Sequence, residues 1–214
     1  MTETFASLIG FVVHLDAHLL DWAQAYGAGL LLILFLIVWA ETGLVVAPFL
    51  PGDSLLFIAG AVAALVGMPL WWLMATLITA ALCGDNTNYW IARRVGPAVF
   101  NRPNSRWLTP ANLDATHRFY ERHGGKTIII ARFVPLMRTF VPFVAGLGRM
   151  TYKPFLAYSL LGALLWVGIL VPAGFWFGNV PLVKENLGLV VIAIIVASVS
   201  PLVWTAARGY LRRR

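Results

Sequence analysis

The chain has 214 residues, of which 60% are hydrophobic and only 12% are charged. Soluble domains carry about 25% charged residues, so this composition predicts an integral membrane protein of the all-α class. Sixteen Lys and Arg against nine Asp and Glu give a net charge of +7. These basic residues lie between apolar segments without a nucleic-acid-binding motif, which argues against a nucleic-acid partner. One cysteine excludes an internal disulfide, and no Cys/His cluster predicts a metal or other cofactor.

Residues 1–26 are predicted to form an N-terminal amphipathic helix in the membrane interface. Within 3–25, polar side chains recur at helical spacing on one side and apolar side chains on the other. The polar positions are Glu3, Ser7, His14, His18 and Asp21. A metal pair or pH sensor at His14 and His18 is the alternative to a wetted helix face, but no third ligand is near. The pattern leaves open whether this helix lies on the membrane or crosses it.

The membrane domain is predicted over 27–207, and its first element is a helical hairpin over 27–67. The apolar segment is interrupted by ETGLVVAPFLPGDS at 41–54. Pro51-Gly52 marks a turn, and Asp53 or Ser54 can cap the second arm. The arms are either two complete spans or one re-entrant hairpin. Both alternatives return the chain to its starting side.

Further segments follow from apolar length, since about 20 helical residues cross the bilayer core. They are a transmembrane helix over 68–95, a hydrophilic loop over 96–126, transmembrane helices over 152–178 and 187–206, and a basic tail over 208–214. In the helix over 152–178, we expect Gly162 and Gly168 to allow close helix packing. Most of the tryptophans are expected to anchor the chain at the membrane interface.

Residues 127–148 carry the functional interpretation. They are apolar, yet they contain Arg132, Pro135, Arg138 and Pro142. A charge at bilayer depth costs a few kcal/mol or more, and proline breaks helices. A broken helix at that depth is tolerated only where it is buried in protein or lines a wet cavity. Because about 22 residues are too few for two spans, we predict a second re-entrant hairpin that carries the site.

The distribution of basic residues supports this topology. If 127–148 is re-entrant, thirteen of the sixteen basic residues fall on one side of the membrane. They are Arg93, Arg94, Arg102, Arg106, Arg118, Arg122, Lys126, Arg149, Lys153, Arg208, Arg212, Arg213 and Arg214. The positive-inside rule then places the 96–126 loop and the C-terminus in the cytoplasm of a multi-pass inner (cell) membrane protein.

Each half of the domain reads as a broken hairpin followed by a transmembrane helix, but the halves start from opposite sides. This pattern predicts two inverted repeats whose turns meet near the midplane. Glu41, Asp53, Arg132 and Arg138 would then lie close together. One interpretation is that they form ion pairs that only lock the hairpins, although buried pairs rarely add net stability.

The other interpretation is an anion site. Arginine presents a planar fork of donors that matches phosphate, so Arg132 and Arg138 are the candidate phosphate ligands. A low-dielectric environment favours the neutral form of a carboxyl group, so Glu41 and Asp53 are candidates for proton coupling. Asp85, with Tyr89, is a secondary candidate whose alternative role is interhelical hydrogen bonding. The hairpin geometry is assigned to Pro48, Pro51, Gly52, Pro135, Pro142 and Gly146.

Three blocks of sequence resemble the DedA family, also called the SNARE-associated or VTT-domain family. They are ETGLVVAPFLPGD at 41–53, RFVPLMRTFVPFVAG at 132–146, and a shorter block with Gly84, Asp85, Tyr89, Arg93 and Gly96. The resemblance implies lipid transport. Bacterial members are implicated in returning undecaprenyl phosphate across the inner membrane and in membrane-potential homeostasis, and eukaryotic relatives are phospholipid scramblases. The essential acids and arginines of the family match Glu41, Asp53, Arg132 and Arg138.

We therefore expect a flippase for an anionic lipid, most specifically undecaprenyl phosphate, with protons or sodium as the coupling ion. A phosphatidylethanolamine scramblase, a small-ion or proton transporter and a non-transporting scaffold are the alternatives. We expect no enzymatic activity, because His14, His18, His117 and His123 lie away from the hairpins without phosphatase-like spacing. The sequence leaves open whether the chain forms a homo-oligomer.

Overall fold

The computed structural model describes residues 19, 21, 22, 25, 27, 29–44, 52–100, 125–134, 137–177 and 180, with backbone alone for 96–100. This part of the chain is helical and contains no strand, which confirms the all-α class. Four predicted segments lie outside it wholly or almost wholly. They are the amphipathic helix over 1–26, the loop over 96–126, the helix over 187–206 and the tail over 208–214.

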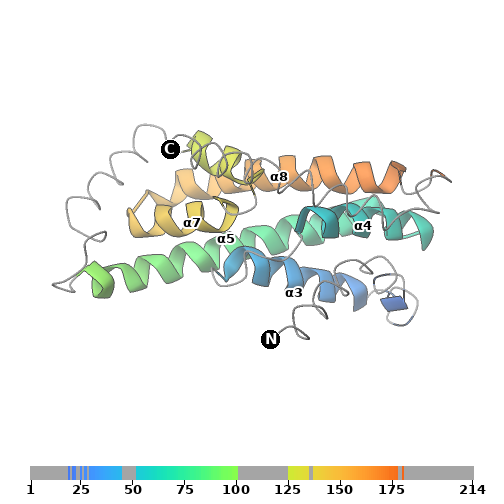
Figure 1. Cartoon of the computed structure of the whole chain (residues 1–214), viewed down its shortest axis with the longest axis horizontal. Helices are drawn as coiled ribbons and strands as arrows, with labels where there is room; N and C mark the ends of the chain where they lie inside the picture. The colour runs from blue at the N-terminus through green and yellow to red at the C-terminus, as the bar shows by residue number, and fades with distance from the viewer. Residues whose placement is uncertain are drawn as a thin grey trace, which may run out of the picture. The chain divides into compact units, whose positions relative to one another are not determined.

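Five labelled helices organise the described residues (Figure 1). They are α3 (Gly29–Gly43), α4 (Gly52–Leu65), α5 (Leu70–Phe100), α7 (Met137–Leu147) and α8 (Tyr152–Phe177), and a shorter helix covers 125–131. With 15, 14 and 11 residues, α3, α4 and α7 fall short of the roughly 20 residues that cross a bilayer. Among the helices described, α8 alone combines sufficient length, 26 residues, with sufficient apolar character.

The observed helices differ from the predicted segments at two places. Helix α5 continues to Phe100, five residues beyond the predicted end of the 68–95 helix. The segment over 127–148 is broken, as expected, but the break lies at 132–134. Pro142 was expected to contribute to a break and instead lies inside α7, so this part of the prediction was wrong. A proline removes only one backbone donor, and Pro142 is buried in a packed helix that tolerates the loss.

Two helices end in the same hydrogen-bonded cap. After α4, the Met68 N–H donates to the Ala63 carbonyl at 2.8 Å, and Gly67 adopts a φ of 69°. After α7, the Met150 N–H donates to the Ala145 carbonyl at 3.0 Å, and Arg149 adopts a φ of 53°. Both are Schellman caps, in which the left-handed position normally favours glycine. Arg149 occupies this position despite its side chain, and the tight turn leads directly into α8.

The chain divides into two compact units. Unit 1 draws on the ranges Met1–Leu32, Pro51–Met74 and Ile169–Arg214, and unit 2 on Ile33–Leu50 and Ala75–Gly168. Three of the four boundaries between the units fall inside α3, α5 and α8, and the fourth falls between Leu50 and Pro51.

In unit 1, the C-terminal part of α8 packs against α4 through glycines. A Cβ atom built on Gly60 would lie 2.2 Å from the Val171 carbonyl oxygen, and one built on Gly174 would lie 1.9 Å from the Phe57 carbonyl oxygen. These glycines let the two backbones approach closely, as small residues do in membrane helix pairs. For Gly168, a Cβ atom would meet no atom of the described residues within 4 Å, so this part of the chain shows no close contact there.

In unit 2, α7 lies alongside α5 and α8 (Figure 1). A hydrophobic cluster joins these helices to the helix over 125–131, and it consists of Tyr89, Ile128, Ala131, Val141, Ala145, Met150 and Phe155. A Cβ atom on Gly146 would lie 2.3 Å from the Tyr89 carbonyl oxygen. Gly146 therefore allows the close approach of α7 to α5.

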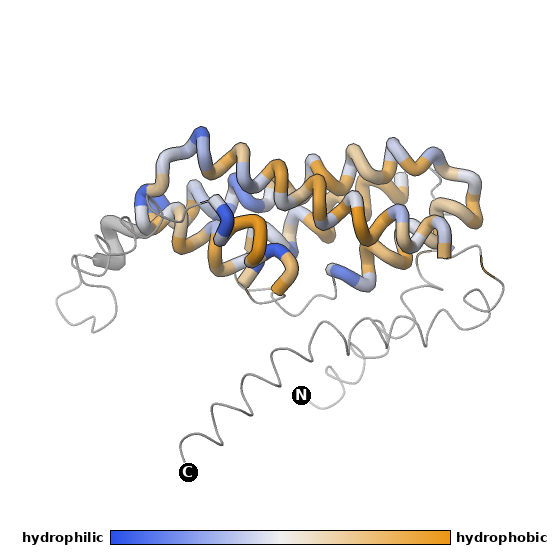
Figure 2. Tube along the Cα trace, turned by 90° about the horizontal axis from the view of Figure 1, so that it is seen from above, coloured by the Kyte–Doolittle hydropathy of each residue, from blue (hydrophilic) through white to orange (hydrophobic). Residues whose placement is uncertain are grey.

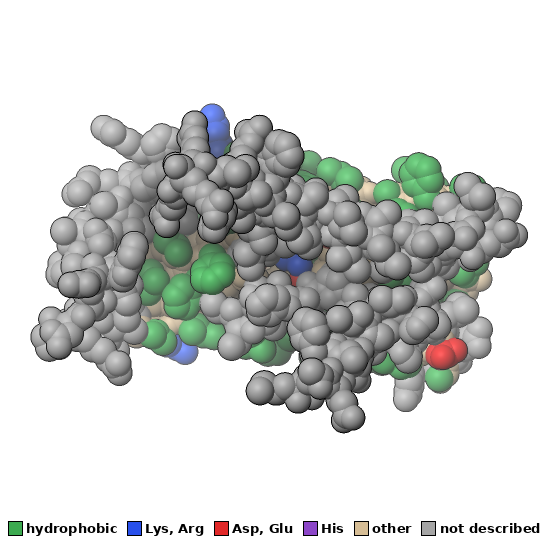
Figure 3. Space-filling view, in the orientation of Figure 1, with side chains coloured by type: hydrophobic (Ala, Val, Ile, Leu, Met, Phe, Trp, Pro, Cys, Tyr) green, Lys and Arg blue, Asp and Glu red, His purple; other side chains and the backbone are tan. Residues whose placement is uncertain are grey.

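The exposed side chains are largely apolar. Hydrophobic residues run along all the helices (Figure 2), and most of the coloured side chains on the face in Figure 3 are hydrophobic. Trp71, Ile130 and Trp176 are 63%, 65% and 68% exposed. A water-soluble protein rarely exposes so many large apolar side chains together, so this surface fits a lipid environment.

We expect Gly174→Ala to destabilise the protein and Gly168→Ala to leave its stability unchanged or raised. The new methyl at 174 would overlap the Phe57 backbone, and overpacking typically costs about 1–3 kcal/mol. At 168 the methyl has open space, and alanine is the better helix former. The measurement is the melting temperature of each variant in detergent. Equal melting temperatures for the two variants would contradict the close contact between α4 and α8.

Candidate functional site

The break in the 127–148 segment places two arginines on either side of a tight turn. The Arg132 and Val134 N–H groups donate to the carbonyls three residues earlier, those of Ile129 and Ala131, at 3.3 and 3.0 Å. The Val134 carbonyl then accepts the N–H of Arg138 at 3.1 Å, at the start of α7. Since Pro135 follows Val134 in the sequence and disfavours helix in the residue before it, the local sequence accounts for the turn.

Arg138 forms a buried ion pair with Glu41. The Nη2 atom of Arg138 donates to Oε1 of Glu41, which lies two residues before the end of α3. Their side chains are 4% and 0% exposed. The two residues are 97 positions apart in sequence, so this pair joins the end of the first predicted hairpin arm to the second hairpin.

Arg132 forms a second buried pair, with Asp85 in the middle of α5. Its Nη1 atom lies 2.5 Å from Oδ2 of Asp85, and the two side chains are 5% and 2% exposed. The Ser159 hydroxyl, from α8, donates to the same Oδ2 atom. Sequence analysis ranked Asp85 as a secondary candidate, but the contacts in unit 2 make it the direct partner of Arg132.

Trp166 lies against both arginines. The guanidinium carbons of Arg132 and Arg138 are 5.6 and 5.3 Å from the centre of its ring. These distances are typical of cation–π contacts. Most of the tryptophans were expected to be anchors at the membrane interface. Trp166 is not such an anchor, because it is only 1% exposed. Because one ring contacts both guanidinium groups, the two ion pairs belong to a single site.

Arg132 has more donors than the described residues satisfy. Its Nη1 atom is used by Asp85 and weakly by the Ser159 carbonyl, at 3.4 Å. Its Nε and Nη2 atoms are buried and have no hydrogen-bond partner among the residues that the structure describes. These two N–H groups point the same way on one edge of the guanidinium plane, the edge that binds carboxylate or phosphate in a bidentate manner.

Asn88 connects the backbones beside the Glu41–Arg138 pair. Its side-chain nitrogen donates to the carbonyls of Thr42 on α3, at 3.2 Å, and Thr139 on α7, at 2.7 Å. Each of these carbonyls belongs to the residue that follows a member of the ion pair. Asn88 therefore fixes the distance between the two helix ends that hold the pair.

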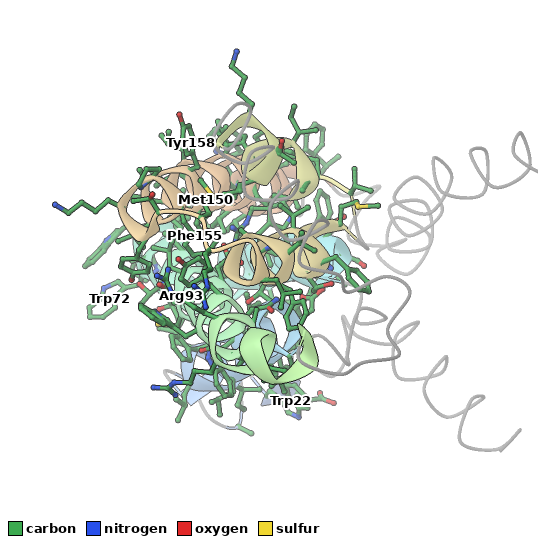
Figure 4. The ribbon with its side chains drawn as sticks, turned by 90° about the vertical axis from the view of Figure 1, so that its left-hand side faces the viewer. Trp22, Trp72, Arg93, Met150, Phe155 and Tyr158 are labelled. Carbon is green, nitrogen blue, oxygen red and sulfur yellow. The ribbon has the colours of Figure 1, made fainter. Side chains whose placement is uncertain are left out.

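Tyr89 is a packing and hydrogen-bonding residue beside the site. Its hydroxyl donates to the Met150 carbonyl at 2.5 Å and receives Arg93 Nη1 at 2.5 Å, and its ring stacks on Phe155 at 4.4 Å. Arg93, Met150 and Phe155 are labelled in Figure 4. With Tyr152, which donates to Asn86 at 2.7 Å, these contacts support α5 against the start of α8.

The remaining predicted site residues have the following places. Asp53 is half-buried in the first turn of α4, in unit 1, and Gly52 is the buried first residue of that helix. Pro48, Pro51 and Pro135 lie outside the described residues.

Three residues in these contacts were missed or underrated from the sequence. Ser159 and Trp166 sit in an apolar helix without a local signal of function, and only their contacts with Asp85 and the arginines distinguish them. Gly162 was expected to favour helix packing, and a Cβ atom there would lie 3.3 Å from Cδ of Arg132. Its missing side chain leaves room for this arginine.

Comparison with known proteins identifies relatives over most of the chain. The VTT domain family matches residues 50–176. Protein DedA of Escherichia coli (strain K12) is 52% identical over 196 residues, which cover 91% of this chain and 90% of the relative. An uncharacterized membrane protein of Mycobacterium leprae (strain TN) is 40% identical over 86% of this chain and 83% of its own length. Inner membrane protein YqjA of Escherichia coli (strain K12) is 34% identical over 70% and 68%.

No solved structure matches the chain. The matched domain includes Asp53, Asp85, Arg132 and Arg138, and the match with Protein DedA covers nearly the whole sequence. The relatives are named as membrane or inner membrane proteins, in agreement with the apolar exposed surface. The chain is therefore a membrane protein of the DedA family, which carries the VTT domain.

Proposed function

We propose that this protein moves a phosphate-bearing lipid, most specifically a polyprenyl phosphate such as undecaprenyl phosphate, across the inner membrane. The observation that carries the proposal is the buried edge of Arg132, whose Nε and Nη2 donors lack partners among the described residues. An arginine that served only as the counter-ion of Asp85 would not need this second edge. A phosphate group offers the two oxygens that such an edge binds.

The surroundings of Arg132 support an anion site shared with Arg138. Both guanidinium groups contact Trp166, and Arg138 is the second residue of α7. A helix N-terminus carries partial positive charge and favours anions. Two arginines and one helix N-terminus therefore combine in a part of unit 2 where little water is present to screen them.

The broken hairpins give a route for a charged group through an apolar medium. In the proposed topology, the short helices α3, α4 and α7 are arms of two re-entrant hairpins that enter from opposite sides, as inverted repeats do in secondary transporters. The 96–126 loop and the C-terminus are cytoplasmic in this arrangement, because it follows the positive-inside rule. The lipid chains remain in the bilayer while the phosphate passes the arginines.

Proton coupling is the second part of the proposal. Glu41 is fully buried and paired with Arg138, and a carboxylate that loses such a partner in an apolar site takes up a proton readily. Asp53, which the family resemblance pairs with Glu41, stays a candidate for a second coupling group. Because the phosphate and Glu41 compete for Arg138, binding of the phosphate favours protonation of Glu41. No step requires a nucleophile, so we propose a transporter and not an enzyme.

The direct test is translocation in proteoliposomes of purified protein. We expect a labelled polyprenyl phosphate to cross faster than in protein-free liposomes, and faster still with a pH gradient. Labelled phosphatidylethanolamine serves as the comparison. Equal rates for both lipids would favour the scramblase alternative, and no movement of either would favour a small-ion transporter or a scaffold. Replacing the pH gradient with a sodium gradient distinguishes the coupling ion.

We expect Arg132→Lys to reduce polyprenyl phosphate transport about tenfold or more at equal expression. Lysine keeps the charge and can still pair with Asp85, but it lacks the bidentate edge, and a charge-assisted hydrogen bond is worth roughly 1.5–3 kcal/mol. Arg149→Lys is the matched control, since Arg149 is exposed after α7. Normal transport by Arg132→Lys would refute the phosphate-binding role of this arginine.

We expect Glu41→Gln to flatten the pH dependence of polyprenyl phosphate transport. Glutamine keeps the size of the side chain and removes its titration, so one protonation step disappears. The measurement is the initial transport rate over a pH series in proteoliposomes, compared with wild type at equal protein content. An unchanged pH profile would exclude Glu41 as a coupling group without excluding transport itself.

A further inference from the structure

The buried charges of unit 2 balance each other. Among its described residues, the buried charged side chains are Glu41, Asp85, Arg132 and Arg138. Two guanidinium groups face two carboxylates in one-to-one pairs. With all four groups ionised the set is neutral, and this neutrality makes burial of four charges tolerable in an apolar environment.

A phosphate that binds to this set disturbs its neutrality. A phosphate monoester carries a charge of about −1.5 to −2 near pH 7, because its second pKa is about 6, and a phosphodiester carries a single negative charge. If the phosphate takes the Nε and Nη2 edge of Arg132 while Nη1 still faces Asp85, one guanidinium group lies between two anions. A buried carboxylate beside a second anion favours its neutral form, so proton uptake restores neutrality.

The Asp85 carboxylate lies between a hydroxyl group and a guanidinium group. Its Oδ2 atom accepts the Ser159 hydroxyl and faces Arg132. A serine hydroxyl can donate or accept, so Ser159 can donate to the Asp85 carboxylate and accept from the protonated acid. Asp85 thus keeps a hydrogen-bond partner in both states.

The contacts of the described residues identify ionisable groups beside the two acids. Asp85 is faced by Arg132, which lies in the turn after the helix over 125–131, and by the neutral Ser159 on α8. On its own helix, Tyr89 lies one turn away with its hydroxyl bonded to Arg93 and to the Met150 carbonyl. Glu41 on α3 is faced by Arg138 on α7.

We infer that Asp85 takes up a proton when a phosphate binds at Arg132, so that Asp85 and Glu41 together bring two protons with a phosphate monoester and one with a phosphodiester. This inference rests on the proposed function, and it adds a proton-binding residue and a stoichiometry that depends on the class of phosphate. The added residue, Asp85, is the partner of Arg132. It is not one of the two acids, Glu41 and Asp53, that match the family's essential pair.

The test counts protons taken up on binding. Farnesyl phosphate, a short polyprenyl monoester, is titrated into the full chain in uncharged detergent at about pH 8, where the monoester is a dianion since its second pKa is about 6. Calorimetry in two buffers of different ionisation enthalpy gives the number of protons bound. We expect two for the wild type, one for Asp85→Asn and one for Glu41→Gln. Asp21→Asn, an exposed change of the same kind, is the control and keeps two.

A short-chain phosphatidylglycerol supplies the diester comparison, with one proton expected for the wild type. If Asp85→Asn binds farnesyl phosphate with an undiminished proton count, the inference is wrong and the proposed function stands. If the wild type binds neither lipid, the proposed function fails and the inference fails with it.

Loss of the charge of Asp85 leaves Arg132 without its partner, so Asp85→Asn can fail to fold. Asp85→Glu keeps the charge and serves in that case. Infrared difference spectra on binding are expected to show a protonated carboxyl band at a different frequency in Asp85→Glu than in wild type. A band that does not move with this substitution would assign the proton elsewhere and overturn the inference.

Discussion

Two buried guanidinium–carboxylate pairs are the constraint on which unit 2 depends. They bring together the end of α3, the middle of α5 and the two sides of the turn before α7, and Trp166 on α8 covers both guanidinium groups. Removing one member of such a pair leaves an uncompensated charge, which typically costs 3–5 kcal/mol. Well-packed apolar residues would hold the same helices at least as firmly, so stability alone does not account for charges at this depth.

The backbone around the pairs shows how the arginines are kept in place. The turn at 132–134 interrupts the helix, and Gly162 leaves room beside the Arg132 side chain. Gly146 brings α7 close to α5 at the Tyr89 carbonyl. In a continuous helix, Arg132 and Arg138 would be one and two-thirds turns apart and would therefore lie on different faces. The break lets both side chains face the same tryptophan.

Sequence reasoning succeeded where the physical signal is local. Arg132 and Arg138 stand out because charges in an apolar segment are costly, and the interruption of that segment follows from its prolines. It was less successful where tertiary packing decides. Asp53 follows Pro51-Gly52 and Asp85 begins the polar stretch over 85–88, and nothing in these neighbours along the chain shows that Asp85 contacts Arg132.

The same reason explains the remaining differences. Pro142 is tolerated inside α7 because it lies on the buried face of that helix, which composition does not reveal. Gly168 and Gly174 are both glycines in the apolar α8, yet within the described part of the chain a neighbouring helix lies close to Gly174 and not to Gly168. Trp166 resembles the interface tryptophans in type, and its burial between two arginines depends on the rotation of α8 about its axis.

The hydrogen bonds of Asn88 have a mechanical consequence. One amide nitrogen on α5 uses both of its hydrogens to tether the main chains of two other helices, α3 and α7. If α7 alone swung away, one amide hydrogen of Asn88 would lose its acceptor in an apolar interior, which is unfavourable. Asn88 thus couples the positions of the three helices. A rearrangement that opens the path past the arginines must either move all three helices as a block or break both hydrogen bonds in a single cooperative step.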